Sequence, residues 1–297
     1  MTPNPPPMHA AATEAPSSSL SAPLRTLLRS LGQIVLQSNA ATGACMLGAW
    51  LLSEPRLVCA ALLGAIAANV SAMLAGSADA DLRAGLPGFN GALAGLAAFS
   101  FIGDPARASA VAILAATATA WLLRPWSRWL RVLGLGYLSS PCLIVTWLWL
   151  PLIASRSLSA GPDAAHPLDA MRFVSGVLAG VAQTGFASGA PAGALVLLGI
   201  AAASRKHALY ALGGATLASA AHLLLGAGVA SFDAGLWGFN GALTALALAD
   251  SGYPAILGGI AMSVLLQAAA LHCGWLTMTA PFVLATWTIQ SLGRRSA

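Results

Sequence analysis

Long apolar runs alternate with short polar or basic segments along almost the whole chain. Ten such runs follow residue 22, and a helix needs about 20 mainly apolar residues to span a membrane. The runs cover residues 28–53, 57–76, 86–102, 106–123, 132–154, 171–203, 207–230, 236–249, 253–271 and 274–290. The first run of each group of five is long enough to be a bent or broken helix. This pattern predicts an all-α polytopic membrane protein.

A stretch of six residues occurs twice, at half the chain length. Gly-Phe-Asn-Gly-Ala-Leu stands at Gly88–Leu93 and again at Gly238–Leu243, which is 150 residues later in a chain of 297. Such a recurrence indicates an internal duplication. Each copy begins a short, glycine-rich run that follows polar sequence. Segments of this kind at matching places in two halves are typical of re-entrant or broken helices that line a pathway.

Five runs in each half predict opposite orientations for the two halves. An odd number of crossings places the second half upside down relative to the first. With a cytoplasmic N-terminus, ten of the fourteen basic residues fall on the cytoplasmic side, as the positive-inside rule demands. The other four are Arg56, Arg107, Arg156 and Arg172. The sequence therefore predicts an inverted repeat with both termini in the cytoplasm.

The same pattern divides the chain into five parts. Residues 1–22 are rich in Pro, Ala and Ser without an apolar core, so we expect a disordered tail rather than a cleaved signal. The first membrane repeat is predicted to span 23–154 and the second 169–292. A polar linker, 155–168, joins them, and a short C-terminal tail follows at 293–297.

Composition narrows the classes of protein that the chain can belong to. Apolar residues make up 58% of the chain and charged residues only 8%, whereas soluble domains carry about a quarter charged residues. In such a chain the net charge of +5 orients helices in a membrane and does not indicate a nucleic-acid partner. The four cysteines stand singly without a CxxC pair, so no metal and no cofactor is predicted.

Two glutamines stand at equivalent positions in the first run of each half. Gln33 and Gln183 are 150 residues apart. A side-chain amide within an apolar helix is costly unless it finds partners or water. The pair is therefore a candidate for flanking one cavity between the halves. The alternative is that each glutamine only bonds a neighbouring helix or the carbonyl of a broken helix.

A pair of hydroxyl residues matches at a different spacing. Ser139 and Thr279 each stand two residues before a proline and lead into a Thr-Trp pair, 140 residues apart. Ten residues are therefore missing from the second half, and the gap falls around Arg124–Arg131, which predicts a basic loop present only in the first half. Each hydroxyl is expected either to cap its own helix or to face the pathway.

The repeated hexapeptide supplies apolar and amide side chains to both halves. Four of its residues are candidates to line a pore, with the Phe and Leu of each copy sharing one helix face: Phe89, Leu93, Phe239 and Leu243. Asn90 and Asn240 are expected to bond the broken backbone and hold the loop. The flanking glycines allow backbones to approach closely: Gly88, Gly91, Gly238 and Gly241.

Nothing in the sequence predicts catalysis. His222 and His272 lie in apolar runs at non-equivalent positions, with no carboxylate spaced to orient them. Covalent catalysis needs a nucleophile and a base held together, and no such pattern is present. We therefore expect a protein that is not an enzyme, although a membrane-embedded enzyme that uses either histidine stays an alternative.

In combination, these motifs resemble the urea transporter family. The carriers of the resemblance are Leu-x-Gly-Phe-Asn-Gly-Ala-Leu twice, a later hydroxyl-x-Pro motif that leads into Thr-Trp, and the stretch Gly32–Asn39. The resemblance covers nearly all of the chain after residue 23. It implies a homotrimer in the cell inner membrane, surrounded by lipid, in which each protomer has its own central pore between two inverted halves. Each half would have five spanning helices and a re-entrant half-helix.

The resemblance also assigns roles to the candidate residues. It implies that Gln33 and Gln183 flank the ends of a selectivity filter, with Ser139 and Thr279 at its middle. The Phe and Leu residues of the hexapeptides would form a flat slot. The sequence departs from the family pattern at Gln183, where some relatives carry Glu, at Ser139, where Thr is usual, and after Gln37, where Asn-Pro is expected.

The expected activity is passive, channel-like movement of urea. Urea is planar and neutral, with N–H donors on its edges, so it suits a slot with apolar walls and acceptors along its sides. No carboxylate or lysine is placed within the apolar runs to couple protons or sodium. The alternatives are a channel for short amides or ammonia and a secondary active transporter.

Overall fold

The computed structural model describes residues 22–153 and 168–295, and every regular element within them is a helix. The predicted tail at 1–22 and the predicted linker at 155–168 lie almost wholly outside these residues. The first half contains α1 (Ala22–Gly32), the 3-10 turn η1 (Gln33–Val35), α2 (Ala40–Ser53), α3 (Arg56–Leu74), α4 (Asp79–Ala84), α5 (Leu86–Phe101), α6 (Pro105–Val132) and α7 (Ser140–Ile153). The second half contains α8 (Ala170–Gln183), α9 (Ala190–Ala203), α10 (Arg205–Leu224), α11 (Val229–Asp233), α12 (Phe239–Ala247), α13 (Tyr253–His272) and α14 (Ala280–Arg295).

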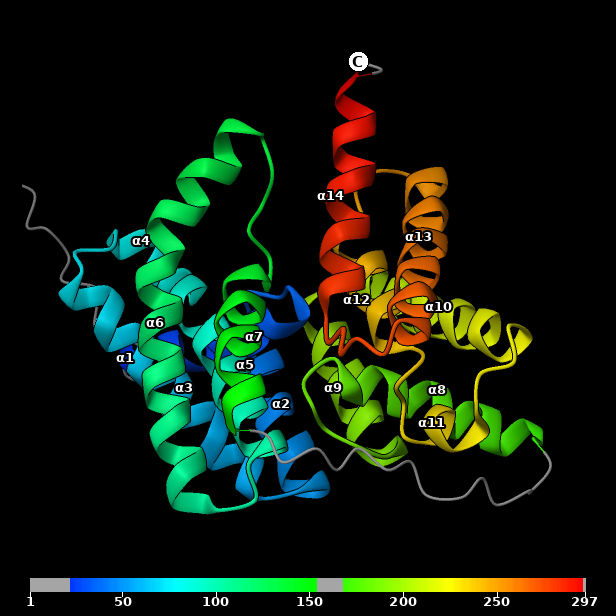
Figure 1. The fold of residues 1–297 in the computed structure, drawn as a ribbon, viewed down its shortest axis with the longest axis horizontal. Helices are drawn as coiled ribbons and strands as arrows, with labels where there is room; N and C mark the ends of the chain where they lie inside the picture. The colour runs from blue at the N-terminus through cyan, green and yellow to red at the C-terminus, as the bar shows by residue number, and fades with distance from the viewer. Residues whose placement is uncertain (1–21, 154–167, 296–297) are drawn as a thin grey trace, which may run out of the picture.

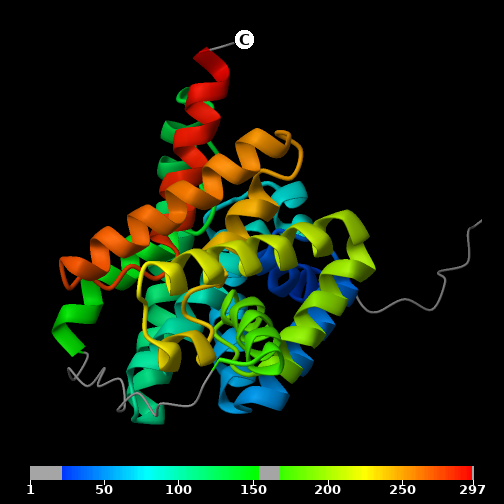
Figure 2. The same ribbon diagram turned by 90° about the vertical axis from the view of Figure 1, so that its right-hand side faces the viewer.

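The two halves follow one backbone plan. Non-glycine residues with positive φ occur in pairs at the spacings that the sequence motifs have. Leu36 (φ 59°) and Phe186 (φ 61°) are 150 apart, and Leu138 (φ 49°) and Met278 (φ 47°) are 140 apart. Figure 1 shows α1–α7 on one side of the molecule and α8–α14 on the other, with α7 and α14 in the middle. Figure 2 faces the second half and shows α13 crossing α14 obliquely.

The predicted break in the first run of each half is confirmed. In the first half, η1 ends at the left-handed Leu36, and the side chain of Asn39 then caps α2 by accepting from the N–H groups of Ala41 (2.8 Å) and Thr42 (3.2 Å). In the second half, Gly189 takes φ 85° directly before α9. A side-chain cap therefore restarts the helix in the first half, and a glycine with positive φ restarts it in the second.

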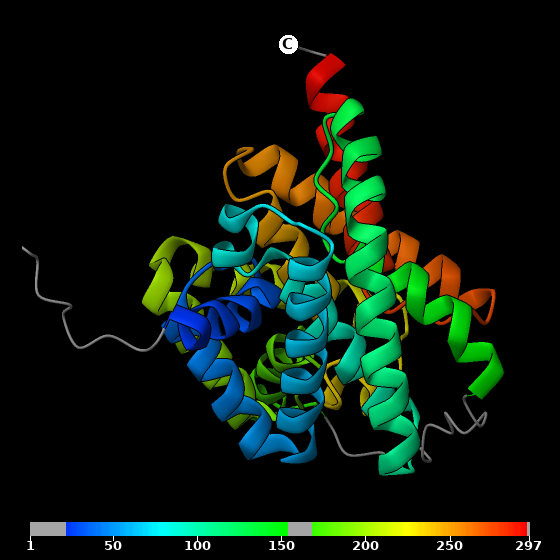
Figure 3. The ribbon, with the colours of Figure 1, turned by 90° about the vertical axis from the view of Figure 1, so that its left-hand side faces the viewer.

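The predicted basic loop at Arg124–Arg131 is wrong. These residues continue α6, which has 28 residues against 20 in its counterpart α13. Figure 3 shows α6 as a long helix whose end lies beside the end of α14. The segment stays helical although it contains Pro125, a residue that costs about 3 kcal/mol in a helix interior. Tertiary contacts outweigh this cost, because the side chain of Leu130 is buried. The length difference between the halves therefore lies mainly in a helix.

Pairs of glycines bring two helices of each half into close contact. A Cβ atom on Gly91 of α5 would collide with the carbonyl oxygen of Gly64 on α3 and with the Ala68 side chain. Gly241 of α12 meets Gly214 and Ala218 of α10 in the same way. Small residues at a helix contact allow backbones to approach closely in membranes, where packing rather than the hydrophobic effect holds helices together.

The lengths and the surface of the helices fit an integral membrane protein. Among the described residues, three helices are long and apolar enough to cross a bilayer: α3, α6 and α13. The apolar helices of 10–17 residues include α2, α5, α7, α8 and α9. Large apolar side chains such as Leu114, Leu148, Leu198 and Leu209 are exposed along the helices. Such a surface is stable against lipid and not against water.

The glycine contact predicts how a single methyl group changes stability. Gly91→Ala places a methyl group against backbone that cannot move aside, and overpacking of this kind costs roughly 1–3 kcal/mol. The matched control is Gly213→Ala on α10, because a Cβ there meets nothing within 4 Å and alanine favours a helix by about 1 kcal/mol. Thermal unfolding in detergent should show a lower midpoint for Gly91→Ala only. Equal midpoints for the two variants would contradict the close contact.

Candidate functional site

Two hydroxyl side chains from the two halves meet in the buried centre of the molecule. Ser139 Oγ and Thr279 Oγ1 are 2.8 Å apart, in a hydrogen bond in which either can donate. Both side chains are buried. Each residue directly precedes the first residue of a helix, α7 for Ser139 and α14 for Thr279. The structure therefore brings together the pair of hydroxyls that the 140-residue spacing matched in the sequence.

Two tryptophans make reciprocal contacts around this centre. The indole N–H of Trp147 donates to the Leu276 carbonyl at 3.2 Å. The indole N–H of Trp287, 140 residues later than Trp147, donates to the carbonyl of Gly136, 140 residues earlier than Leu276, at 2.7 Å. An exchange of contacts in this way is the mark of a two-fold relation between two surfaces. The two helix-start segments therefore make matching contacts with each other.

Asn90 and Asn240 hold the non-helical segments that precede α7 and α14. Asn90 Nδ2 donates to the Leu138 carbonyl at 3.0 Å, and Asn90 Oδ1 accepts from the N–H of Cys142 at 3.2 Å. Asn240 makes the same two bonds, to the Met278 carbonyl and from the Phe282 N–H, each at 3.2 Å. Each amide thus bonds a left-handed residue and the first turn of the following helix.

The apolar residues of the hexapeptides lie beside these segments. Phe89 and Leu93 are buried, and the Phe89 ring stacks on Tyr137 with centroids 6.1 Å apart. In the second half, Leu243 is buried and Phe239 half-buried, and both pack in a cluster with Phe282. The flanking glycines allow this approach, since a Cβ on Gly88 or Gly238 would meet the hydroxyl of a serine on a neighbouring helix.

Gln33 and Gln183 each bond the end of a short helix. Gln33 Nε2 donates to the Ala84 carbonyl of α4 at 3.4 Å, and Gln183 Nε2 donates to the Ala234 carbonyl that follows α11 at 3.1 Å. The Ser38 hydroxyl also donates to Ala84, at 2.9 Å. Both amides therefore bond a carbonyl at the end of a helix. Their contacts are again equivalent in the two halves.

One polar residue at this site was missed in the sequence. Gln267 of α13 is buried, accepts from Asn240 Nδ2 at 2.9 Å and donates to the Leu236 carbonyl at 2.8 Å. The matching residue of the first half is Thr119, whose hydroxyl bonds only the Ala115 carbonyl of its own helix. An amide inside the apolar run 253–271 is the signal that could have shown it.

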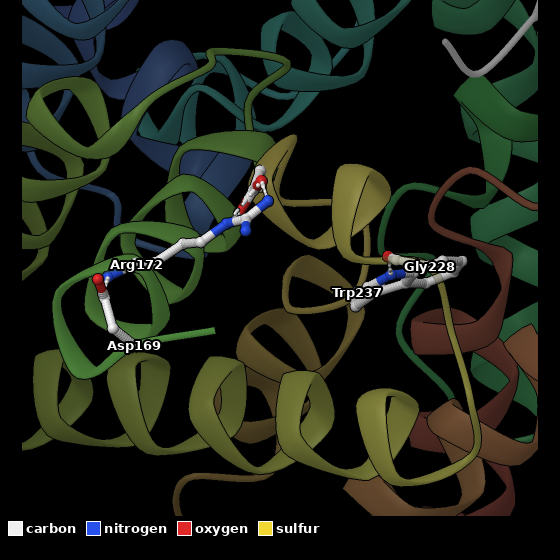
Figure 4. A network of polar contacts seen from close by, with 5 residues as sticks. Asp169, Arg172, Gly228 and Trp237 are labelled. Carbon is white, nitrogen blue, oxygen red and sulfur yellow. Dashed lines mark hydrogen bonds and ion pairs between the residues drawn. The ribbon is translucent and has the colours of Figure 1, made fainter. Parts of the chain in front are cut away.

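A network of polar contacts ties α11 to α8 and positions the start of α12 (Figure 4). Asp169 caps α8 by accepting from the Arg172 N–H at 2.7 Å. Arg172 Nη2 also lies 2.6 Å from Asp233 Oδ2, at the end of α11. The Trp237 indole donates to the Gly228 carbonyl at 3.0 Å. The α11 segment is thus fixed at both ends, by an ion pair and by a tryptophan.

The two candidate histidines lie in different surroundings. The His222 ring is buried, stacks on Trp237 with centroids 5.0 Å apart, and bonds the Ala218 carbonyl through Nδ1 at 2.9 Å. His272 is exposed at the end of α13. Among the described residues, no group of three His, Cys, Asp or Glu side chains is placed to hold a metal ion.

The paired acids and bases of the described residues lie at the ends of helices. Lys206 Nζ donates to Asp250 Oδ1 at 3.0 Å. This hydrogen bond and the charge of Lys206 lower the pKa of the exposed Asp250 carboxyl below its ordinary value. The buried polar side chains are hydroxyls, amides and the His222 imidazole. Within the described residues, the centre of the molecule is therefore polar without a buried carboxylate or ammonium group.

These features define a class of protein: a helical membrane protein whose two similar halves meet at buried, neutral polar groups, as in transporters built from repeats. The chain belongs to the urea transporter family, whose family model matches residues 24–293. Proteins of this family are transporters rather than enzymes.

Three mammalian proteins illustrate how similar the chain is to known members. The chain is 27% identical to "Urea transporter 1" of Capra hircus over 290 residues, which cover 88% of this chain and 74% of that protein. The values for "Urea transporter 1" of Ovis aries are the same. For the protein of that name from Rattus norvegicus, identity is 27% over 236 residues, or 75% of this chain and 62% of that protein.

The bonds of Gln267 predict a loss of stability when its amide is removed. Gln267→Leu leaves the Leu236 carbonyl and one donor of Asn240 with fewer partners, and a buried unpaired polar group costs about 1–3 kcal/mol. Thr119→Val is the matched control, because its hydroxyl bonds only its own helix. Thermal unfolding in detergent should show a clearly lower midpoint for Gln267→Leu than for Thr119→Val. Equal midpoints would refute a bridging role for Gln267.

Proposed function

We propose that this protein carries urea passively, as a channel, along a pathway between its two halves that passes Ser139 and Thr279. The observation that supports this most is the direct hydrogen bond between these two buried hydroxyls at 2.8 Å. In transporters built from repeats, the solute site lies at the interface between the two halves. The two matched hydroxyls lie at such a contact. Urea transport agrees with the family to which the chain belongs.

The chemistry of the surrounding residues suits urea. Its four N–H donors need acceptors along two edges, and the chain breaks before α7 and α14 carry backbone carbonyls and hydroxyl oxygens. Its flat faces need apolar walls, for which Phe89, Leu93, Phe239 and Leu243 are the proposed slot. Each hydrogen bond to the solute replaces one to water and is worth about 0.5–1.5 kcal/mol net. Weak bonds of this size favour fast release.

The two hydroxyls also define the narrowest point of the proposed pathway. Because Ser139 and Thr279 bond each other directly, a urea molecule that passes between them must exchange this bond for bonds to itself. Ser139 and Thr279 each offer one donor and two acceptors, so the exchange keeps the number of hydrogen bonds. Gln33 and Gln183 are the proposed ends of this filter, and the Asn and Gly residues of the hexapeptides hold its backbone.

Neutral polar groups support passive flux. A transporter coupled to protons or sodium needs an ionisable or charged group that changes its occupancy during the cycle. The buried polar side chains of the described residues are hydroxyls, amides and one imidazole, whose Nδ1 bonds the Ala218 carbonyl and whose buried Nε2 has neither an acidic nor any other hydrogen-bond partner in the described structure. Driving force is then supplied by the urea gradient alone.

We further infer that the halves, 23–154 and 169–292, are inverted in the cell inner membrane with both termini cytoplasmic. The reciprocal contacts of Trp147 and Trp287 support a two-fold axis between the halves. The odd number of apolar runs in each half places this axis in the membrane plane. The family resemblance supports assembly as a homotrimer with one pore in each protomer.

Urea flux into proteoliposomes tests the proposed solute and site. Stopped-flow light scattering with an inward urea gradient and no ion gradient should show fast re-swelling for the unchanged protein. Thr279→Val keeps the volume and removes the hydroxyl, so we expect roughly tenfold slower urea entry, which corresponds to about 1.4 kcal/mol on the barrier. Ser139→Val should act in the same direction.

The control for this experiment is Thr288→Val on α14, an exposed threonine whose hydroxyl bonds its own helix. It should transport urea at the unchanged rate. Flux no faster than that of protein-free liposomes would reject urea as the solute, and short amides and ammonia would be tested next. A requirement for a proton or sodium gradient would reject the passive mechanism.

Cysteine labelling tests the inverted arrangement. Arg56 and Lys206 are exposed residues at the start of the equivalent helices α3 and α10. With the four native cysteines replaced by alanine, Arg56→Cys should react with a membrane-impermeant maleimide on intact spheroplasts. Lys206→Cys should react only after the membrane is permeabilised. Labelling of both cysteines from the same side would contradict the inversion.

A further inference from the structure

The last two turns of α6 have no counterpart in the second half. Buried residues of α6 and α13 match at a spacing of 148, as Ala112 with Ile260 and Ala116 with Val264 show. At this spacing Arg124 matches His272, the residue at which α13 ends. Pro125–Val132 is therefore an addition to the first half, here called the α6 extension, and it holds Arg128, Arg131, Trp126 and Trp129.

The α6 extension is held firmly by its neighbours. Leu130 is buried, and the Trp126 indole donates to Ser140 Oγ at 2.8 Å. Arg294 of α14 donates to the Leu133 carbonyl, just beyond the helix end, at 2.8 Å. Arg124, directly before the extension, donates to the carbonyls of Ala75 and Gly76 after α3. The helical backbone of the extension is therefore fixed relative to the rest of the protein.

Its exposed surface continues the apolar face of α6. Leu114, Trp121 and Val132 lie seven and eleven residues apart, so they share one face of the helix, and they are 71%, 67% and 86% exposed. Trp129, 53% exposed, lies beside this face. The exposed apolar face at Leu114 therefore continues, as Trp and Val, to the end of the helix.

A row of arginines borders this apolar face. Arg124, Arg128 and Arg131 are spaced by four and three residues, so they form one stripe along the helix, and all three are exposed. In the part of the chain that the structure describes, the ion pairs that form involve other basic residues. The stripe thus presents positive charge along the edge of a surface that faces lipid.

The length of α6 places this stripe at the level of the lipid headgroups. A helix of 28 residues is about 42 Å long, whereas the hydrocarbon core measures about 30 Å and the bilayer with its headgroups about 40–45 Å. Tryptophan concentrates at the membrane–water interface, and arginines next to a membrane attract anionic lipids. The spacing of the arginines and tryptophans, their exposure and the length of α6 therefore all suit the layer of lipid headgroups.

We propose that the α6 extension binds the headgroups of anionic phospholipids in the leaflet through which it passes. Arg128 and Arg131 contact the phosphate and the negatively charged headgroup, and Trp129 and Val132 contact the upper acyl chains. Arginine suits this role because its planar fork bonds phosphate oxygens in pairs. This interaction is independent of the solute that the protein transports.

Lipid binding to the purified protein in detergent tests the proposal. Fluorescently labelled phosphatidylglycerol and phosphatidylcholine are titrated into the unchanged protein, and affinity is read from fluorescence anisotropy. Phosphatidylglycerol should bind at least tenfold more tightly than phosphatidylcholine. The double variant Arg128→Gln/Arg131→Gln should lose this preference, while Arg128→Lys/Arg131→Lys should keep most of it.

The matched control removes two arginines elsewhere. Arg56→Gln/Arg107→Gln changes the net charge equally, outside the extension, and should bind phosphatidylglycerol within twofold of the unchanged protein. Equal affinities of the unchanged protein for the two lipids would overturn the proposal, and so would equal losses in the two glutamine variants. Displacement of phosphatidylglycerol by millimolar inorganic phosphate would also overturn it, because the site would then bind free anions rather than lipid.

Discussion

The fold depends on how hydrogen bonds are satisfied where the chain stops being helical inside the molecule. Backbone N–H and C=O groups at a helix break within a membrane find no water, so the protein itself must bond them. Asn90 and Asn240 do this for the segments before α7 and α14, each with one donor and one acceptor contact. Gln33 and Gln183 bond the ends of α4 and α11 in the same way. These amides position the backbone that the proposed urea pathway uses.

Pairing residues by their spacing in the sequence selected residues that lie far apart along the chain and that contact each other in the structure. The spacing of 140 matched Ser139 with Thr279, and the structure places their hydroxyls within a hydrogen bond. Residues of the same kind, hydroxyls at this spacing and amides at the spacing of 150, could be paired because a break in the backbone leaves few side chains able to bond it. Gln267 escaped this comparison because its counterpart is Thr119, a residue of different type and reach.

The comparison of the two halves gave a wrong prediction where the amino-acid composition of a segment does not distinguish a loop from a helix. The Arg124–Arg131 segment was predicted to be a basic loop because the ten residues missing from the second half fall there, yet it completes α6. The segment contains Pro125, which disfavours a helix interior, and the buried Leu130 supports the helix through tertiary contacts that override this preference. Hydropathy marks where a chain can leave the hydrocarbon layer and does not mark where its helix ends.

Symmetry is kept and lost in different parts of the molecule for a physical reason. Positive φ values, asparagine contacts and glycine contacts are duplicated, because each solves a backbone problem that both halves share. Contacts that support the backbone in one half only have diverged: Gln267 bonds the Leu236 carbonyl, whereas Thr119 bonds its own helix, and α6 is longer than α13 by two turns. A urea molecule crossing the proposed pathway would therefore meet an equivalent backbone from either side. The groups that support that backbone differ between the halves, because Gln267 bonds the Leu236 carbonyl and Thr119 makes no equivalent bond.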